Sequence, residues 1–126
     1  MKFEIHQIKL TKEEHDKINA EGHDSVAKHR AKIDMSFSSG ISDLAFKAWD
    51  SNYYTHVANI TLGPLDEHKL NEVFKIGNIG PENKIVRLDK MHSISVADII
   101  VQGSRKWVVA DGGFEEIFNE NERKAI

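Results

Sequence analysis

The sequence predicts a single α+β domain, a mixed or antiparallel sheet with two or three helices on one side. Three observations support this fold class: a strand-like N-terminal segment leads into a capped helix, residues 53–62 are rich in aromatic and β-branched side chains, and two apolar runs flank a glycine turn near Gly103. The length of 126 residues fits one domain. We expect the C-terminal hairpin to curl into a partial barrel.

The first twenty residues carry the clearest local pattern of the N-terminal half. Apolar and charged residues alternate over the first positions, which predicts an edge or outer strand. Thr11 and Glu14 then have the spacing of a capping box, with Thr at N-cap and Glu at N3. The helix that they begin is expected to run to about Ala20, and Gly22 suits its C′ position.

Residues 23–50 give a weaker pattern. Val26 and its neighbours allow a helix, but the alternation of apolar and polar residues over 31–37 favours a strand, followed by a turn at 38–40. Ser42 is then expected to cap a short helix that carries Leu44, Ala48 and Trp49 on one side.

The middle of the chain predicts a strand followed by a helix. Residues 53–62 are expected to form a central strand that Gly63-Pro64 interrupts. Asp66 can cap a helix that runs through about Lys75 and ends at Gly77. Residues 76–81 then read as a tight loop.

The C-terminal third is expected to form a compact unit over residues 91–118. Two apolar runs, 95–101 and 105–110, flank a turn at 102–104, which predicts a β-hairpin. Residues 114–118 then form a short strand or a helix turn, and the polar tail 119–126 is expected to fray.

Composition excludes several classes of site. The formal net charge is −3, which is neither the basic excess typical of a phosphate-neutralising nucleic-acid binder nor the strong acidity of a DNA mimic. There is no cysteine, so disulfides and thiolate chemistry are excluded, and the cytoplasm is the expected compartment. The N-terminal residues lack a signal-peptide pattern, and no stretch reaches the roughly 20 apolar residues of a membrane span.

Seven histidines are many for this length, yet none has a helical partner four residues away. A metal site would need distant histidines to converge with a carboxylate, so the sequence predicts no metal site and no cofactor. A Ser-His-Asp arrangement could recruit Ser93 or Ser95, His92 or His56, and Asp98, but no G-x-S-x-G elbow is present. We therefore assign no catalytic residue. The loop that contains Gly77 and Gly80 has no lysine like that of a P-loop. These glycines therefore predict a tight turn and not a phosphate-binding loop.

Two sets of residues remain as binding candidates. A ligand pocket would form if polar residues of the middle and C-terminal segments converged. These candidates are His56, Asn78, His92, Ser93, Ser95 and Asp98. A nucleic-acid-binding module would instead use short basic runs with aromatic residues that stack on bases. That alternative set is Lys28, Arg30, Lys32, Tyr53, Tyr54, Arg105, Lys106 and Trp107.

The residues from Met91 to Ile100, followed by 107–110 and by Gly113 to Ile117, resemble the YodL-like family. That family has a His/Arg-Ser-apolar-Ser-Val-Gly-Asp-apolar segment, a hairpin and a closing Gly-Phe-x-x-Ile. Residues 70–78 are similar to its preceding helix, and the best match covers about the last 50 residues. Ala97 departs from the usual glycine, which implies either a turn that needs no positive φ or a family glycine that serves close packing.

The resemblance implies an accessory protein of a phage or conjugative element, acting in the bacterial cytoplasm. Together with the missing catalytic motifs, it favours a non-enzymatic protein that binds and modulates a bacterial host protein, in host takeover or counter-defence. A homodimer is a further possibility, and no membrane contact is expected. The alternatives are a nucleic-acid or nucleotide-binding module and a small hydrolase or metalloenzyme that uses His56, His92 and Asp98.

Overall fold

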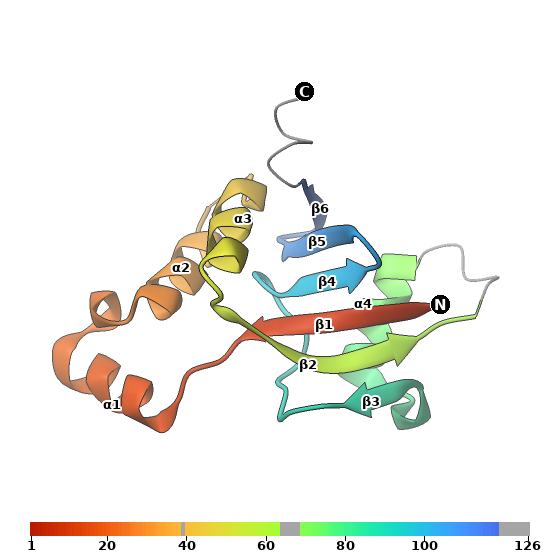
Figure 1. Ribbon diagram of the computed structural model, residues 1–126, viewed down its shortest axis with the longest axis horizontal. Coiled ribbons are helices and arrows are strands. Elements are labelled where there is room, and N and C mark those ends of the chain that lie inside the picture. The colour runs from red at the N-terminus through yellow and green to blue at the C-terminus, as the bar shows by residue number, and fades with distance from the viewer. Residues whose placement is uncertain (39, 64–68, 119–126) are drawn as a thin grey trace.

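The computed structural model describes residues 1–38, 40–63 and 69–118, and they form an α+β domain around one sheet (Figure 1). Its strands are β1 (Lys2–Ile8), β2 (Tyr54–Thr61), β3 (Ile85–Arg87), β4 (Ile99–Gln102), β5 (Arg105–Ala110) and β6 (Gly113–Ile117). The α-helices are α1 (Lys12–Glu21), α2 (Ala27–Ser36), α3 (Ser42–Asp50) and α4 (Lys69–Ile79), with short 3-10 turns η1 (His23–Ser25) and η2 (Glu82–Lys84).

The sheet is antiparallel throughout and has the order β3-β2-β1-β4-β5-β6. The expected α+β class is confirmed, but the two end strands do not pair, so the sheet does not close into a barrel. The prediction of an outer strand at the N-terminus is wrong. β1 lies in the middle of the sheet between β2 and β4, because Phe3 and Ile5 face one apolar layer while Ile8 faces the other.

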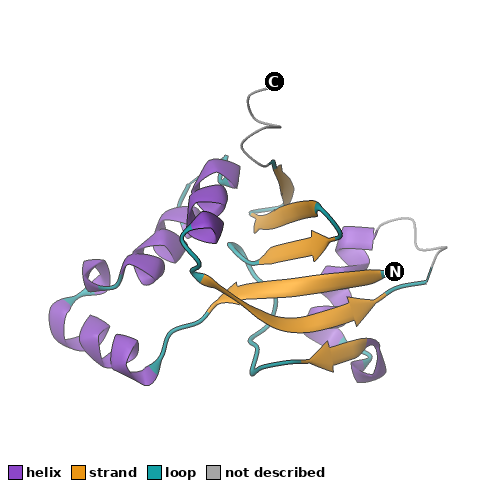
Figure 2. Ribbon diagram, viewed as in Figure 1, coloured by secondary structure: helices purple, strands orange, loops and turns teal. Residues whose placement is uncertain are grey.

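Helices cover both faces of the sheet, not one face as expected. On one face, Val73 and Ile76 of α4 pack on the apolar residues of β1 and β2. On the other face, Met35 of α2 and Ala45 and Ala48 of α3 pack on β4 and β5. In the view of Figure 2, α4 lies behind the sheet, whereas α1 projects away from it.

We call residues 12–36 the helical arm. The structure confirms one prediction for this segment and contradicts another. The capping box is present, since Thr11 Oγ1 accepts the Glu14 N–H and Glu14 accepts the Thr11 N–H. Residues 31–37, expected as a strand, lie mostly in α2. The alternation is misleading because Met35 is buried while Phe37 is 87% exposed. Ser42 is inside α3 rather than capping it, since Ile41 holds the N-cap position.

The strand expected at 53–62 is confirmed as β2, but the helix after it ends later than predicted. Gly77 lies inside α4, which continues to Ile79. A Cβ at position 77 would stand 2.2 Å from Ile94 Cδ1, so the glycine allows α4 to approach the chain at Ile94. Gly80 and Pro81 alone form the tight turn. The predicted cap at Asp66 lies outside the described residues, as does the 119–126 tail.

The C-terminal hairpin is confirmed, with Gln102 opposite Arg105 across a Gly103-Ser104 turn. Its first strand begins at Ile99, later than expected, because residues 95–98 form a tight turn in which the Asp98 N–H donates to the Ser95 carbonyl. Ala97 has φ +83 in this turn. The interpretation that the turn needs no positive φ is therefore wrong. Residues 114–118 contribute to a strand, β6.

Candidate functional site

A buried glutamine fixes the chain segment that leads to β4. Gln7 Nε2 donates to the His92 carbonyl at 2.9 Å and to Asp98 Oδ2 at 3.0 Å, and Gln7 Oε1 accepts the His92 N–H at 3.2 Å. The side chains of Gln7 and Asp98 are both buried. Because buried polar groups are costly to leave unpaired, these bonds hold the 91–98 segment against β1.

The carboxyl group of Asp98 is electrostatically unusual. Burial raises its pKa to about 6, although the Ser95 N–H, His92 and Gln7 all favour the charged form. The contact from Ser95, at 2.9 Å, comes from its backbone N–H and not from its hydroxyl. His92 Nδ1 lies 4.0 Å from Asp98 but 2.7 Å from the Ser93 carbonyl oxygen. The geometry stabilises a turn and does not assemble the nucleophile and base of a Ser-His-Asp triad.

Asn78 anchors the same segment from the other side. Its Nδ2 donates to the Ile94 carbonyl at 3.2 Å and its Oδ1 accepts the Ile94 N–H. One side-chain amide thus pairs with both the N–H and the C=O of one residue, as a neighbouring strand would. Asn78 is therefore a positioning residue for the 91–98 segment.

His56 lies away from the other predicted ligand residues. On β1, His6 and Gln7 are consecutive, so their side chains point to opposite faces of the sheet. His56 stacks on His6, with ring centroids 4.6 Å apart, whereas His92 and Asp98 contact Gln7. The predicted hydrolase constellation of His56, His92 and Asp98 is consequently split between the two faces.

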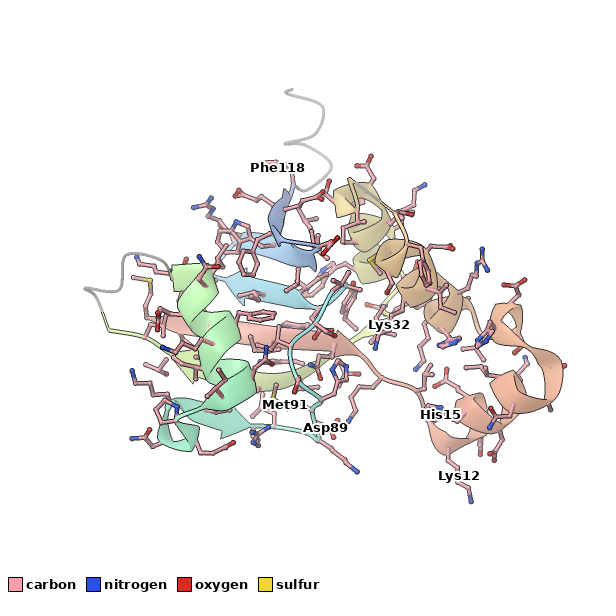
Figure 3. The ribbon with its side chains drawn as sticks, turned by 180° about the vertical axis from the view of Figure 1, so that it is seen from behind. Lys12, His15, Lys32, Asp89, Met91 and Phe118 are labelled. Carbon is pink, nitrogen blue, oxygen red and sulfur yellow. The ribbon has the colours of Figure 1, made fainter. Side chains whose placement is uncertain are left out.

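A cleft separates the helical arm from the loop at residues 88–92, and we call it the arm–loop cleft. It consists of two adjoining hollows of about 430 and 280 Å³ that share Ile8, Leu10, His15 and Lys32. Figure 3 shows the lining residues His15 and Lys32 on the arm side and Met91 on the loop side, next to Asp89, which is not part of the lining. The remaining lining residues are Lys9, His29, Ile33, Ser36, Phe37, Lys90 and His92.

The lining of the arm–loop cleft is cationic. It contains three lysines and three histidines and no carboxylate. Among the described residues, Lys9 pairs with Asp89 at 2.9 Å, whereas no ion pair forms at Lys32 or Lys90. The pKa of His29 is lowered by burial and then by the nearby charges of His23, Lys32 and His15. This field favours an anionic ligand.

The floor of the arm–loop cleft is apolar. Ile8 and Leu10 continue β1 into the cleft, and Ile33 and Met91 line its two sides. Phe37 adds an aromatic ring at the end of α2 that is largely in contact with solvent. A ligand that fits this surface therefore carries apolar as well as acidic groups.

The predicted nucleic-acid residues do not form one surface. Lys28 pairs with Glu14, Arg30 with Asp24 and Asp34, and Arg105 with Glu116. The Tyr54 hydroxyl donates to the Ala97 carbonyl at 2.7 Å, the pKa of Tyr54 is raised by burial, and Trp107 is buried. Tyr53 is half-buried, and Lys106 lies over the Trp49 ring. Of this set, only Lys32 lines the cleft.

Sequence reasoning missed the residues that organise both regions. The sequence does not mark Gln7, because a polar residue in a short strand is expected to face solvent. Lys9, Lys90 and His15 come from three separate segments, so no linear basic run marks them. Glu4 and His6 have the i, i+2 spacing that places both on one face of a strand, which is the one signal that was available.

Searches of protein-family models, curated proteins and solved structures found no match to this chain. In the part of the chain that the structure describes, no helix combines the length and the apolar character that crossing a bilayer requires.

Proposed function

We propose that this chain is a non-enzymatic binding protein of a phage or mobile element, which docks an acidic segment of a bacterial host protein in the arm–loop cleft and thereby modulates that host protein. The observation that carries the proposal is the lining of the cleft, in which cations surround an apolar floor without a carboxylate. The resemblance of residues 91–117 to YodL-like proteins supplies the biological setting.

Charge complementarity favours an acidic partner. The whole chain has a net charge of −3, so the cationic cleft is a local exception to its surface. A carboxylate of the partner can reach Lys32 or Lys90 without first breaking an ion pair between described residues. Such contacts accelerate association and exclude basic competitors.

The apolar floor favours a protein segment over a nucleic acid. Side chains of a folded or extended partner can fill the space beside Ile8, Leu10 and Met91, and Phe37 offers an exposed aromatic contact. Base stacking is hindered at Trp107, which is buried, and at Tyr54, whose partly buried ring is held by a hydrogen bond from its hydroxyl to the Ala97 carbonyl. Binding of nucleic acid is therefore the alternative that the experiment must distinguish from binding of a protein segment.

Charge reversal on both sides of the arm–loop cleft tests the proposal. The double variant Lys32→Glu/Lys90→Glu reverses two cleft cations, and Lys12→Glu/Lys17→Glu makes the same change of net charge on exposed α1 positions. Each protein is used to capture partners from bacterial lysate, and binding of a labelled peptide that alternates glutamate with leucine is measured by fluorescence anisotropy. Single-stranded DNA of comparable charge serves as the competing probe.

The proposal predicts that the peptide binds the wild type, that its affinity falls as salt rises, and that reversal in the cleft weakens binding at least about tenfold. The α1 control should bind within about twofold of the wild type. Equal loss in both variants, no peptide binding at all, or stronger binding of DNA than of the peptide would refute it. In lysate, the same host protein must be captured by the wild type and the α1 control and lost from the cleft variant.

A second variant separates the apolar contribution from charge. Phe37→Ala removes an aromatic ring that is 87% exposed, so the free energy of unfolding should change little. Peptide binding should weaken about fivefold or more because buried aromatic contacts dominate many interfaces. Unchanged affinity would show that Phe37 is outside the docking surface.

A further inference from the structure

A β-bulge between β1 and β2 gathers polar side chains on the α3-facing side of the sheet. Ile5 pairs with Ala58 and His6 pairs with His56, so Val57 has no direct partner on β1. In a regular strand, His56 and Asn59 are three positions apart and would face opposite sides. The extra residue puts both on the face that carries Glu4 and His6. Bulges commonly redirect side chains in this way at functional sites.

Four donor atoms meet at this bulge. Glu4 Oε1 lies 2.9 Å from His6 Nε2 and 3.9 Å from His56 Nε2, and Asn59 Oδ1 lies 2.7 Å from His56 Nε2. The nearest ligand atoms of Glu4, His6 and His56 are all within 4.8 Å of one another. Two ligands bound at 2.0–2.2 Å in a tetrahedral site are about 3.4 Å apart, so small side-chain rotations bring this set to a metal-binding geometry.

We propose that Glu4, His6 and His56, with Asn59 as a fourth donor, form a binding site for a divalent transition-metal ion of the zinc class. Two imidazoles and one carboxylate are a donor set suited to such ions, and cysteine is absent from the chain. The site uses the sheet face that carries α3, and it is therefore independent of the proposed docking in the arm–loop cleft.

A neighbouring ring holds one histidine of the site in place, and one side of the site is open. His6 is held edge-on by Trp49, with ring centroids 4.8 Å apart, and its side chain is only 12% exposed. A hollow of about 250 Å³ lined by His6, Trp49, Asn52, Tyr54 and His56 leaves room for water or an exchangeable ligand. Two cations are nearby, Lys2 next to Glu4 and Lys106, which lies against the Trp49 ring. To bind an ion through Nε2, each neutral imidazole would carry its ring proton on Nδ1, and metal–ligand bonds would take the place of the His6–Glu4 and His56–Asn59 contacts.

Titration of tag-free protein with Zn²⁺ by calorimetry tests the site, and Co²⁺ absorption reports the coordination geometry. The wild type should bind one equivalent of Zn²⁺, and bound Co²⁺ should give the intense visible bands of a four-coordinate site. Glu4→Gln and His56→Gln nearly keep side-chain volume while they replace a carboxylate or an imidazole with a more weakly binding amide, so each should weaken binding about tenfold or more. Circular dichroism and thermal melting check that both variants fold.

The matched control is His29→Ala, because His29 and His23 form a second stacked pair whose ring nitrogens are 3.0 Å apart. This variant should retain the Zn²⁺ affinity and the Co²⁺ spectrum of the wild type. The proposal is overturned if the wild type binds no Zn²⁺, if the Glu4 and His56 variants bind as tightly as the wild type, or if His29→Ala abolishes binding. The Zn²⁺ titration does not depend on whether the arm–loop cleft binds the peptide. Either proposal can therefore fail while the other stands.

Discussion

The two sides of the arm–loop cleft are held in different ways. On the loop side, Gln7, Asp98 and Asn78 fix the 91–98 segment through buried and partly buried hydrogen bonds. On the arm side, the Lys28–Glu14 ion pair at 2.7 Å and the η1 turn connect α1 to α2, and the only buried residue of α1 is Ile18. α1 also projects away from the sheet (Figure 1).

This difference teaches how one small domain can offer both a fixed and an adaptable surface. Buried polar networks impose one geometry because every broken bond leaves an unpaired group. Surface ion pairs add little stability, and regions with few buried contacts open at low free-energy cost. We expect the loop side to set the position of a bound segment and the arm to adjust to its shape. The following substitutions can break or sharpen that contrast.

Gln7→Ala should have the largest effect on stability. It removes the partner of the His92 backbone and of Asp98, and it leaves a cavity next to β1. We expect the free energy of unfolding, measured with urea, to fall by about 3 kcal/mol. Gln102→Ala at the end of β4 is the matched control and should cost well under 1 kcal/mol, since surface substitutions typically change stability by about 0.5 kcal/mol. Similar losses in both would remove the basis for a fixed loop side.

Asp98→Asn should change how stability depends on pH. Burial raises the folded-state pKa of Asp98 from 3.8 to about 6, so the folded protein binds this proton more tightly than the unfolded chain. The associated stability is present below the unfolded-state pKa and is lost as pH rises through about 6. The loss above that pH is up to about 3 kcal/mol.

The asparagine variant lacks this loss. Its stability relative to the wild type should therefore rise between about pH 4 and pH 7. Urea unfolding of both proteins across that range gives the comparison, with Asp111→Asn at the exposed turn before β6 as the control. Parallel pH profiles of Asp98→Asn and the wild type would contradict the assignment.

Lys28→Ala tests the arm side and should have a smaller effect. It breaks the ion pair that joins α1 to α2, and the free energy of unfolding should fall by less than about 1 kcal/mol. Hydrogen exchange should nevertheless become faster at the amides of α1 while those of β4 and β5 keep their protection. Equal acceleration in both regions would mean that the arm and the sheet unfold together.

Ala97→Gly should give the smallest change. Glycine relieves the positive φ in the 95–98 turn, but it removes a methyl group that is 1% exposed in the core. Strain relief and the lost burial are each about 1 kcal/mol, so the net change should stay within about 1 kcal/mol. A stabilisation above 2 kcal/mol, seen by thermal melting, would show that strain dominates at this position.

Local patterns predicted local structure well. The capping box at Thr11 and Glu14, the β-rich segment 53–62 and the glycine turn at Gly103 all act within a few residues, and each was recognised. Failures came where distant contacts decide. Residues 31–37 lie mostly in a helix, in which Met35 packs against α3 and the sheet. Position 77 requires a glycine because the Ile94 side chain lies where a Cβ would be.

The candidate sites depended even more on distant contacts. His6 and His56 meet only because β1 and β2 pair with a bulge, and a bulge has no signature in this sequence. The three lysines of the cleft come from the end of β1, from α2 and from the 88–92 loop. Strand register and helix placement bring them together, and a local pattern does not show which distant segments will meet.

The most direct test of the account is an NMR titration of the ¹⁵N-labelled wild type with the glutamate–leucine peptide. The account predicts that amide shifts gather on both sides of the arm–loop cleft, at His15 and Lys32 on the arm and at Lys90 and His92 on the loop, with larger line broadening on the arm. Shifts that gather instead on β5 and β6, or on one side of the cleft alone, would contradict it.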